Sequence, residues 1–564
     1  MTMKPEGVSE VSAFQWDTEV DVLVIGFGAA GACAALQAWE DGARVMLVDR
    51  FDGGGTTAAS GGVIYAGATR FQAEAGFDDD IDNMMAYLAT EVGDVVSPET
   101  LRRFCEGSAA DLDWLIANGL AFSSEAHLAK ASFPPEGKYL YYSGNEKAPA
   151  NAAVARPVPR GHRPVGAGFG GRHFHEGLAK RIAETSIEVR THCWAQRLVV
   201  GDDKRVAGVE LAFLDDAYVP LHSRLYANSN PITPKDNKVH EQSLQEIEKI
   251  EAEHSRSLKV KVRGGVILAT GGYAFNTALL SEFNPAIVQA DAKFHRLATL
   301  GNDGTGMEMG RLAGGVLRRM NSLYIARHIV PAALTKGILI NSAGKRFIAE
   351  DAYISLIGEA ISRQEGGNAW LIINASTFRK ALKQVFGSGW HLFRYYAVRI
   401  LPNILLGGTR RAGRLERLAK TLGLPVESLL ASVSAHDEDV DAGLPDRLGK
   451  SPDGRLKLGS GPYYAINMKF SNRHALTLLM TLGGLSVDEE DGSVLHADGS
   501  KIEGLFAAGN CAVGLHSNGY ISGLAIADCV FAGRRAGRSA SSGKAGDAAI
   551  GAIERPAIDR AASD

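Results

Sequence analysis

Two hydroxyl side chains near the end of the chain, those of Tyr520 and Ser522, stand two residues apart and just before Gly523. A phenol and an alcohol can both donate and accept hydrogen bonds, so this pair can pass a proton along. An unperturbed phenol has a pKa of about 10, so it acts as a base at neutral pH only if its charged form is stabilised or its proton is relayed. Ser522 suits that supporting role. The spacing therefore predicts acid–base chemistry centred on Tyr520.

The elements around these hydroxyls form a junction between a strand and a helix. A strand-like run, 504–508, leads into Gly509-Asn510-Cys511, and a helix of small residues is expected from about 524 to 536. Glycines permit close backbone approach, and a helix start offers unpaired N–H groups with a partial positive charge. Such a place suits an electron-rich ring. We therefore predict cofactor contacts at Gly509, Asn510, Gly523, Leu524 and Ala525.

Another glycine-rich turn lies near the start of the chain. A strand, 21–25, runs into a Gly-x-Gly-x-x-Gly turn, and a helical stretch, 32–41, and a second strand, 44–48, follow before Asp49. This order is typical of a dinucleotide-binding βαβ unit, in which the backbone approaches the pyrophosphate and the acid takes the ribose hydroxyls. The alternative is a tight turn with a structural role alone. The predicted contacts are Gly26, Gly28, Ala29, Ala30, Gly31, Asp49 and Arg50.

A second glycine loop, 53–62, comes directly after this acid. A simple NAD domain does not need such a loop, whereas the isoalloxazine ring of a flavin must thread past the pyrophosphate into the protein, so we expect FAD. A later strand, 265–268, ends in Ala-Thr-Gly-Gly, which is a further feature of flavoproteins. These segments add the predicted contacts Gly55, Thr56, Thr57, Ser60, Gly61, Gly62, Ala269, Thr270 and Gly271.

Composition excludes several classes of function. The chain has 564 residues, 45% hydrophobic and 22% charged, which is enough for a sizeable core in two or three domains. A formal net charge of −4 argues against a nucleic-acid partner. Five cysteines without a CxxC motif argue against zinc, iron–sulfur, haem and disulfide frameworks, so we expect no metal site. We find no signal-peptide pattern and no apolar run of about 18 residues, which favours a cytoplasmic location and leaves peripheral membrane contact open.

Two segments each have two interpretations. The polar segment of about 215–256 has a helical middle at 241–251, with Leu244, Ile247 and Ile250/Glu251 on a narrow stripe, and is typical of a solvated insertion or of an interface. The aromatic segment 139–146 either lines a hydrophobic pocket, with Tyr141 as a third pocket tyrosine, or forms a surface turn.

The glycine loop at 53–62 and the Ala-Thr-Gly-Gly run resemble those of the flavoprotein subunits in the succinate dehydrogenase and fumarate reductase superfamily. The resemblance implies an α/β fold: a Rossmann-like FAD-binding domain of the glutathione-reductase type with an inserted α+β capping domain that carries half the active site. The implied division is a first FAD-binding segment, the capping domain, a second FAD-binding segment and a flexible tail, at 18–273, 274–458, 459–537 and 538–564.

The sequence departs from that superfamily at two positions. Succinate dehydrogenases carry the flavin covalently on a histidine just before the threonine of this loop; Gly55 stands there, so the resemblance implies non-covalent FAD. Fumarate reductases protonate a dicarboxylate with an arginine, and Tyr520 stands in that place. A dicarboxylate prefers bidentate guanidinium partners, whereas a phenol and a hydroxyl suit a neutral ketone.

The tyrosine at this position resembles that of the 3-ketosteroid dehydrogenases. Their Δ4-(5α) branch has Tyr-x-Ser-Gly here, as at 520–523, and their Δ1 branch has Tyr-Pro-Gly-x-Gly. Both branches also carry a tyrosine after an Arg-Phe/Tyr-x-x-Glu element, here Tyr353 after 346–350. The resemblance implies a steroid-like hydrophobic ketone as substrate, hydride transfer to flavin N5, proton transfer to a tyrosine network and an external electron acceptor. The implied catalytic residues are Tyr353, Tyr520 and Ser522.

Three alternatives stay open at this point: a 3-ketosteroid Δ1-dehydrogenase, a fumarate-reductase-like ene-reductase acting on a small acid, and a flavin-binding redox-partner protein without a substrate of its own. The direction of the reaction is also open, because related flavoenzymes run as ene-reductases.

Overall fold

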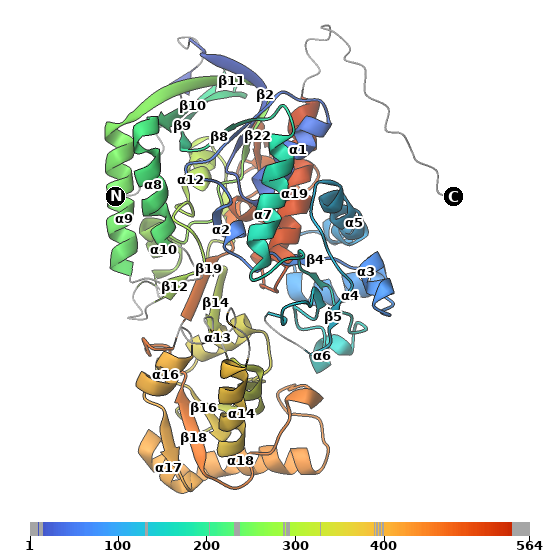
Figure 1. The fold of residues 1–564 in the computed structure, drawn as a ribbon, viewed down its shortest axis with the longest axis vertical. Helices are drawn as coiled ribbons and strands as arrows, with labels where there is room; N and C mark the ends of the chain where they lie inside the picture. The colour runs from blue at the N-terminus through green and yellow to red at the C-terminus, as the bar shows by residue number, and fades with distance from the viewer. Residues whose placement is uncertain are drawn as a thin grey trace.

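The computed structural model describes residues 9–10, 15–129, 133–201, 203–229, 237–285, 288, 294–327, 329–387, 390, 393, 396, 400–475 and 477–543. Figure 1 shows an upper body built around a large sheet and a lower body built around a smaller one, with the strands β14 and β19 running between them. The cofactor contacts predicted from sequence lie in the upper body, and Tyr353 comes from the connection to the lower body.

The large sheet begins with the predicted βαβ unit. β2 (Thr18–Ile25) pairs in parallel with β3 (Val45–Val48), and α1 (Ala29–Glu40) connects them. β11 (Ser255–Leu268) pairs in parallel with β2 on one side and with β22 (Lys501–Ala507) on the other. β2 and β3 are almost wholly buried, and so are the last residues of β11 (264–268) and of β22 (504–507), as parallel strands covered on both faces require. β22, the strand that leads into the Gly509 junction ahead of Tyr520, therefore ends close to the first glycine turn.

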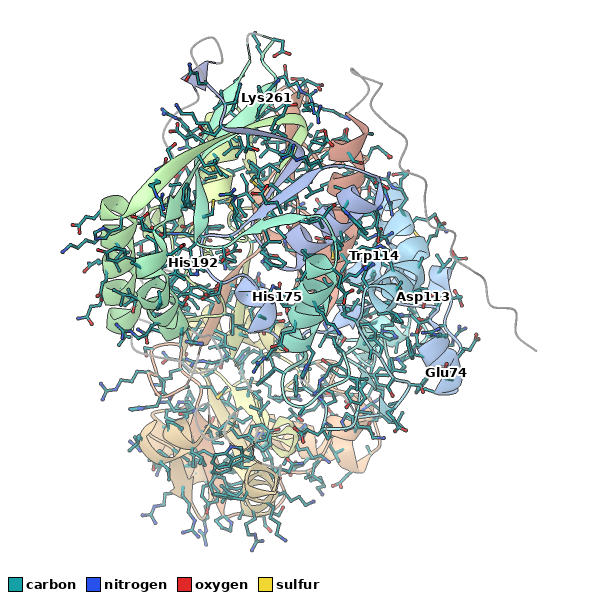
Figure 2. All side chains as sticks on the ribbon, turned by 45° about the horizontal axis from the view of Figure 1, so that its top comes forward. Glu74, Asp113, Trp114, His175, His192 and Lys261 are labelled. Atoms are coloured by element: carbon teal, nitrogen blue, oxygen red, sulfur yellow. The ribbon has the colours of Figure 1, made fainter. Side chains whose placement is uncertain are left out.

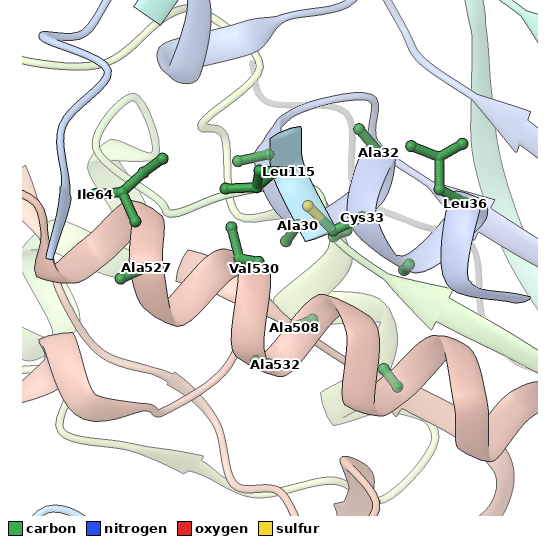
Figure 3. Close-up of a cluster of buried hydrophobic side chains, with 14 of the residues drawn as sticks. Ala30, Ala32, Cys33, Leu36, Ile64, Leu115, Ala508, Ala527, Val530 and Ala532 are labelled. Atoms are coloured by element: carbon green, nitrogen blue, oxygen red, sulfur yellow. The ribbon is translucent and has the colours of Figure 1, made fainter. Parts of the chain in front are cut away.

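The last helix, α19 (Leu524–Ser542), packs directly on α1, and Figure 3 shows Ala30 and Val530 within this contact. A Cβ atom at Gly533 or Gly537 would lie 2.5 Å from the carbonyl oxygen of Ala30 or Ala34, so glycine is needed for the two backbones to approach. This packing brings together the two glycine-rich junctions that the sequence places at opposite ends of the chain.

The described part of the segment at 215–256 is largely helical and packs on the upper body. It leaves the sheet after the antiparallel strands β9 (Cys193–Val200) and β10 (Val206–Leu214), and it contains η2 (Asp216–Tyr218), α8 (Val219–Tyr226), η3 (Ala227–Ser229) and α9 (Asn237–Glu253). Figure 1 shows α8 and α9 side by side in green. Leu225, Ile247 and Ile250 join a buried cluster with Trp194 and Phe275. The narrow apolar stripe of α9 therefore has a partner inside the chain.

The lower body is a four-stranded antiparallel sheet with helices against it. Its strand order is β15 (Ile338–Ile340), β16 (Trp370–Asn374), β18 (Tyr463–Asn467) and β17 (Arg410–Ala412). β18 pairs with both β16 and β17, although we expected the FAD-binding part to resume at residue 459. Among the described residues, the helices of this body include α13 (Ile354–Ser362), η5 (Glu365–Gly367), α14 (Ala375–Phe386), α16 (Leu401–Leu406), α17 (Leu415–Leu422), α18 (Val426–Asp441) and η6 (Pro452–Gly454).

A small sheet connects the two bodies. β19 (Thr477–Thr481) pairs antiparallel with β14 (Leu323–Arg327) and in parallel with β12 (Phe294–Arg296). Tyr353 directly precedes α13, which packs on β14. The connection therefore places the start of α13 close to the end of the large sheet.

The remaining elements surround these bodies. The other helices are α2 (Gly55–Ala58), α3 (Arg70–Glu74), α4 (Ile81–Val92), α5 (Pro98–Ala117), α6 (Pro149–Ala152), α7 (Gly170–Ala183), α10 (Thr277–Phe283), α12 (Thr305–Leu312), η4 (Ala332–Lys336), η7 (Gly509–Cys511) and η8 (Leu515–Ser517). The other strands are β1 (Ser9–Glu10), β4 (Ile64–Tyr65), β5 (Ala126–His127), β6 (Leu140–Tyr141), β7 (Gly161–His162), β8 (Glu188–Arg190), β13 (Leu317–Arg318), β20 (Gly484–Leu485) and β21 (Ser493–Leu495).

The last helix runs into the expected tail. α19 continues to Ser542, beyond the expected start of the tail at 538, and residues 544–564 of that tail lie outside the described residues. Within the described part of the chain, none of the helices combines the length and the apolar character needed to cross a bilayer.

Candidate active site

A cavity of about 350 Å³ lies where the two glycine-rich junctions meet. Gly31, Leu524 and Tyr353 are the predicted site residues that do not line it. The predicted residues that do line it are Gly26, Gly28, Ala29, Ala30, Asp49, Arg50, Gly55, Thr56, Thr57, Ser60, Gly61, Gly62, Ala269, Thr270, Gly271, Gly509, Asn510, Tyr520, Ser522, Gly523 and Ala525.

The three glycines of the first turn have different environments. Gly26 has a φ of +108°, and a Cβ atom there would lie 2.4 Å from the carbonyl oxygen of Ala269. At Gly31 a Cβ atom would lie 1.7 Å from the carbonyl oxygen of Gly26, so Gly31 is required for helix α1 to pack on the turn. At Gly28 a Cβ atom would meet only Thr57 Oγ1, at 3.5 Å. The space in front of Gly28 therefore belongs to the cavity.

Polar side chains hold the turn and the second glycine loop together. The two carboxylate oxygens of Asp49 accept hydrogen bonds from the backbone N–H groups of Phe27 (2.7 Å) and Phe51 (2.8 Å). Thr57 Oγ1 accepts one from the N–H of Ala29 at 3.0 Å, at the start of α1. Asp49 thus links the first glycine turn to the chain that follows β3, and these hydrogen bonds fix its carboxylate at the cavity wall.

The cavity suits a long polar cofactor with an aromatic ring. Its wall combines exposed backbone at Gly28 with a buried polar atom, Trp194 Nε1, that has no hydrogen-bond partner in the protein. A buried donor without a partner costs about 1–3 kcal/mol, which a bound polar ligand would recover. At its other end the cavity reaches Tyr520 and Ser522. The lining residues therefore fit FAD.

Three tyrosines gather beside that end of the cavity. The ring of Tyr520 lies 4.6 Å from that of Tyr324 and 6.2 Å from that of Tyr353, measured between centroids. Burial raises the pKa of Tyr520 to about 12. It raises the pKa of Tyr353 well above its ordinary value, and the nearby Ser522 hydroxyl opposes that rise. The fold therefore brings the three predicted catalytic residues together, and both phenols are protonated at neutral pH.

Tyr141 lies in the interior, on the short strand β6. Burial raises the pKa of its phenol, and the Ser522 hydroxyl is again close enough to oppose the rise. Segment 139–146 is therefore not a surface turn, and Tyr141 is buried near Ser522 without lining the cavity, so its role as a third pocket tyrosine stays a prediction.

Several residues of the cavity wall were not predicted. They come from connections far apart in the chain, namely Phe51, Trp194, Tyr226, Thr299, Asn302, Asp303, Met309 and Met480. The Gly-Asn-Asp-Gly-Thr-Gly run at 301–306 was a signal that could have identified Asn302 and Asp303, because it is one more glycine-rich loop before a helix. The others had no local signal.

The comparisons with known proteins agree with this site. The FAD binding domain family matches residues 21–523. The 3-oxo-5-alpha-steroid 4-dehydrogenase of Comamonas testosteroni is 33% identical over 90% of this chain and 96% of its own length. A probable fumarate reductase of Shewanella frigidimarina is 26% identical over 92% of this chain and 74% of its own.

Among solved structures, the 3-ketosteroid-Δ4-(5α)-dehydrogenase of Rhodococcus jostii RHA1, in complex with 4-androstene-3,17-dione, superposes with a TM-score of 0.79 at 28% identity. The superposition covers 95% of this chain and 100% of the Rhodococcus chain. The family match spans both glycine-rich junctions, and the Comamonas relative is matched over nearly its whole length. This chain is therefore a flavoprotein of the FAD binding domain family, with FAD as its cofactor, and it belongs to the group that contains the 3-oxo-5-alpha-steroid 4-dehydrogenase.

Proposed function

We propose that this protein is an FAD-dependent 3-ketosteroid Δ4-(5α)-dehydrogenase, which introduces a carbon–carbon double bond next to a ketone. The observation that carries the proposal is the meeting of Tyr353 and Tyr520, with ring centroids 6.2 Å apart, beside Ser522 at the end of the cofactor cavity. Among the described residues that line the cavity, Arg50 has the only guanidinium, and Glu251 and Asp303 both bind it. A neutral ketone fits these groups better than a dicarboxylate does.

The protein residues act on the ketone and on one proton. A protonated phenol can donate a hydrogen bond to the ketone oxygen, which stabilises the charge that develops there as the neighbouring carbon loses its proton. Tyr520 belongs to this ketone and acid–base network, and Ser522 supports it. Because Tyr353 is protonated, it takes the substrate proton at the facing wall while passing its own phenol proton to the nearby Ser522 hydroxyl, which relays a proton onward toward solvent. The next carbon gives up a hydride, and FAD supplies the hydride acceptor when bound.

Three further points belong to the proposal. FAD is held without a covalent bond, since Gly55 offers no side chain for attachment. An external acceptor must reoxidise the flavin in the cytoplasm. The Rossmann-like FAD-binding domain is divided into 18–273 and 459–537 around a capping domain at 274–458, although β18 pairs within the lower sheet, α19 continues to Ser542, and residues such as Asn302 of the proposed capping domain line the cofactor cavity.

The substrate and product test this function directly. Added anaerobically, 5α-androstane-3,17-dione should bleach the oxidised flavin band of the protein and yield the 4-ene, because the phenols hold the 3-ketone and the proton leaves from its neighbouring carbon. Absorbance and product analysis by mass spectrometry measure both. A 1-ene product would instead assign the enzyme to the Δ1 reaction. Rapid turnover of fumarate with no response to steroid would exclude the ketosteroid function, and a flavin reduced only by another protein would indicate a redox partner.

A further inference from the structure

The insertion at 215–256 reaches the cofactor cavity with an aromatic ring. Tyr226, the last residue of α8, lines the cavity and stacks on Phe51, with centroids 4.2 Å apart and ring planes 10° apart. Phe51 also stacks on His222 of α8, whose Nδ1 lies 3.0 Å from Nδ1 of His192 (labelled in Figure 2). The insertion is thus part of the wall of this cavity.

The insertion also holds a cation at the same place. Glu251 of α9, 1% exposed, accepts hydrogen bonds from Arg50 Nε at 2.8 Å and Nη2 at 2.7 Å. The remaining nitrogen of Arg50, Nη1, donates to Asp303 at 2.7 Å. Arg50 therefore joins the insertion, the end of β3 and the loop before α12 around one side of the cavity. Removing the Glu251 carboxylate would break both of its hydrogen bonds to Arg50 and leave Asp303 to hold the guanidinium.

We infer that the insertion closes the adenosine end of the FAD site and retains the cofactor through Tyr226 and Glu251. In a dinucleotide-binding βαβ unit the pyrophosphate lies at the helix start and the ribose lies at the acid that ends the second strand. That acid is Asp49 here, and Arg50 and Phe51 follow it directly. The groups that the insertion packs against therefore lie beyond the ribose, where the adenine is bound.

Affinity for FAD and for ADP tests this role without any turnover. Tyr226→Ala and Glu251→Gln should each weaken FAD binding by the apoprotein about tenfold or more, and should weaken ADP by a similar factor, because ADP keeps the adenosine and the pyrophosphate of FAD and lacks only the flavin end. Fluorescence titration measures FAD, and calorimetry measures ADP. Tyr226→Leu removes the aromatic ring but keeps apolar volume at this position, so it tests the same role if Tyr226→Ala does not fold.

Glu253→Gln is the matched control, since Glu253 lies exposed on the same helix and should leave both affinities unchanged. Wild-type affinity for FAD and ADP in both test variants would refute the proposal that the insertion closes the adenosine end of the site. So would a loss of FAD affinity with unchanged ADP affinity, because it would locate the effect at the flavin end.

A separate set of contacts concerns the catalytic residues. Ser143 Oγ donates a hydrogen bond to the carbonyl oxygen of Ser522 at 2.8 Å, and Asn145 Oδ1 accepts one from the backbone N–H of Tyr353 at 3.0 Å. Ser143 and Asn145 are both buried. Two residues of one short segment, 143–146, therefore hold the backbones of two catalytic residues that come from distant parts of the chain.

This segment is itself fixed from behind. Tyr87 OH accepts a hydrogen bond from the N–H of Asn145 at 2.8 Å, and Asn145 Nδ2 donates to Glu91 Oε1 at 3.0 Å. The carboxylate of Glu146, 1% exposed, accepts from the N–H of Gly144. α4, which carries Tyr87 and Glu91, thus gives the segment a rigid support.

We propose that Ser143 and Asn145 are positioning residues, which set the separation between Tyr353 and Ser522. This proposal rests on the proposed function for its effect on rate, but not for its effect on structure. Because a displacement of about 1 Å in an active site can lower the rate about 10²-fold, the loss of one such contact should act on catalysis more than on substrate affinity.

Asn145→Ala tests this positioning, and Asn151→Ala is its control, because Asn151 Nδ2 also donates to Glu91 Oε1 (2.9 Å), whereas within the described part of the chain Asn151 makes no hydrogen bond to Tyr353. We expect Asn145→Ala to keep FAD, to lower the rate of flavin reduction about 10–100-fold with KM changed less than about threefold, and to show less than additive loss when combined with Tyr353→Phe. Asn151→Ala should stay near wild type.

Hydrogen exchange separates this proposal from the proposed function. In Asn145→Ala the amide of Tyr353 should lose protection, whatever the substrate proves to be, and in Asn151→Ala it should not. Unchanged protection would refute the positioning role. A rate loss that is fully additive with Tyr353→Phe would also refute it, since it would indicate general destabilisation. Failure of the wild type to oxidise any steroid would refute the proposed function alone.

Discussion

Replacing either phenol at the end of the cavity should remove most of the activity and leave the cofactor in place. Tyr520→Phe and Tyr353→Phe are each expected to lower the rate of flavin reduction by steroid about 10²–10⁴-fold, the usual range for acid–base groups. Phenylalanine keeps the aromatic ring at each position, so the packing of residue 520 against Tyr324 and the FAD occupancy should persist. Stopped-flow absorbance under anaerobic conditions, with FAD content measured beside it, checks the result.

Two further variants make this experiment specific to the catalytic phenols. Ser522→Ala should lose less, because Ser522 supports the phenols and does not itself act on the substrate. Tyr464→Phe is the control for loss of a phenol, since Tyr464 stacks on Phe378 in the lower body. Near wild-type rates in both Tyr520→Phe and Tyr353→Phe would remove the tyrosines from the mechanism and with them the basis of the proposed function.

A side chain at Gly28 should empty the cofactor site without unfolding the protein. Gly28 has an ordinary φ of −87°, and a Cβ atom there meets only Thr57 Oγ1, so Gly28→Val can fold. Its methyl groups would project into the space where the backbone approaches the pyrophosphate. We expect purified Gly28→Val to be colourless, whereas acid should release all flavin from the yellow wild type.

Two other glycine substitutions serve as the control and as the contrast for Gly28→Val. Gly107→Ala places a methyl group on α5 in open space and should keep full FAD occupancy. Gly31→Val should instead fail to fold, because its Cβ atom would collide with the Gly26 carbonyl oxygen. Full occupancy in Gly28→Val would mean that the pyrophosphate lies elsewhere. Flavin that stays on acid-denatured wild-type protein would contradict non-covalent binding.

Much of the cofactor site was predictable because its signals are local. The Gly-x-Gly-x-x-Gly turn, the strand before it and Asp49 lie within one stretch of chain, and the backbone geometry that they require restricts the residues at each position. The same holds for 520–523, where a short motif indicated both the hydroxyls and the absence of an arginine. The family comparison confirms the FAD cofactor and the flavoprotein group that these motifs indicated.

Tertiary structure alone decided what surrounds the motifs. The meeting of Tyr353 with Tyr520 depends on how β14 and β19 join two bodies. The burial of Tyr141 and the contacts of Asn145 depend on helices from another part of the chain. The stripe on α9 was visible in the sequence as Leu244, Ile247 and Ile250, but periodicity shows only that a face is apolar. Which surface covers that face, and which side chains meet in a cavity, follows from long-range packing that no local pattern encodes.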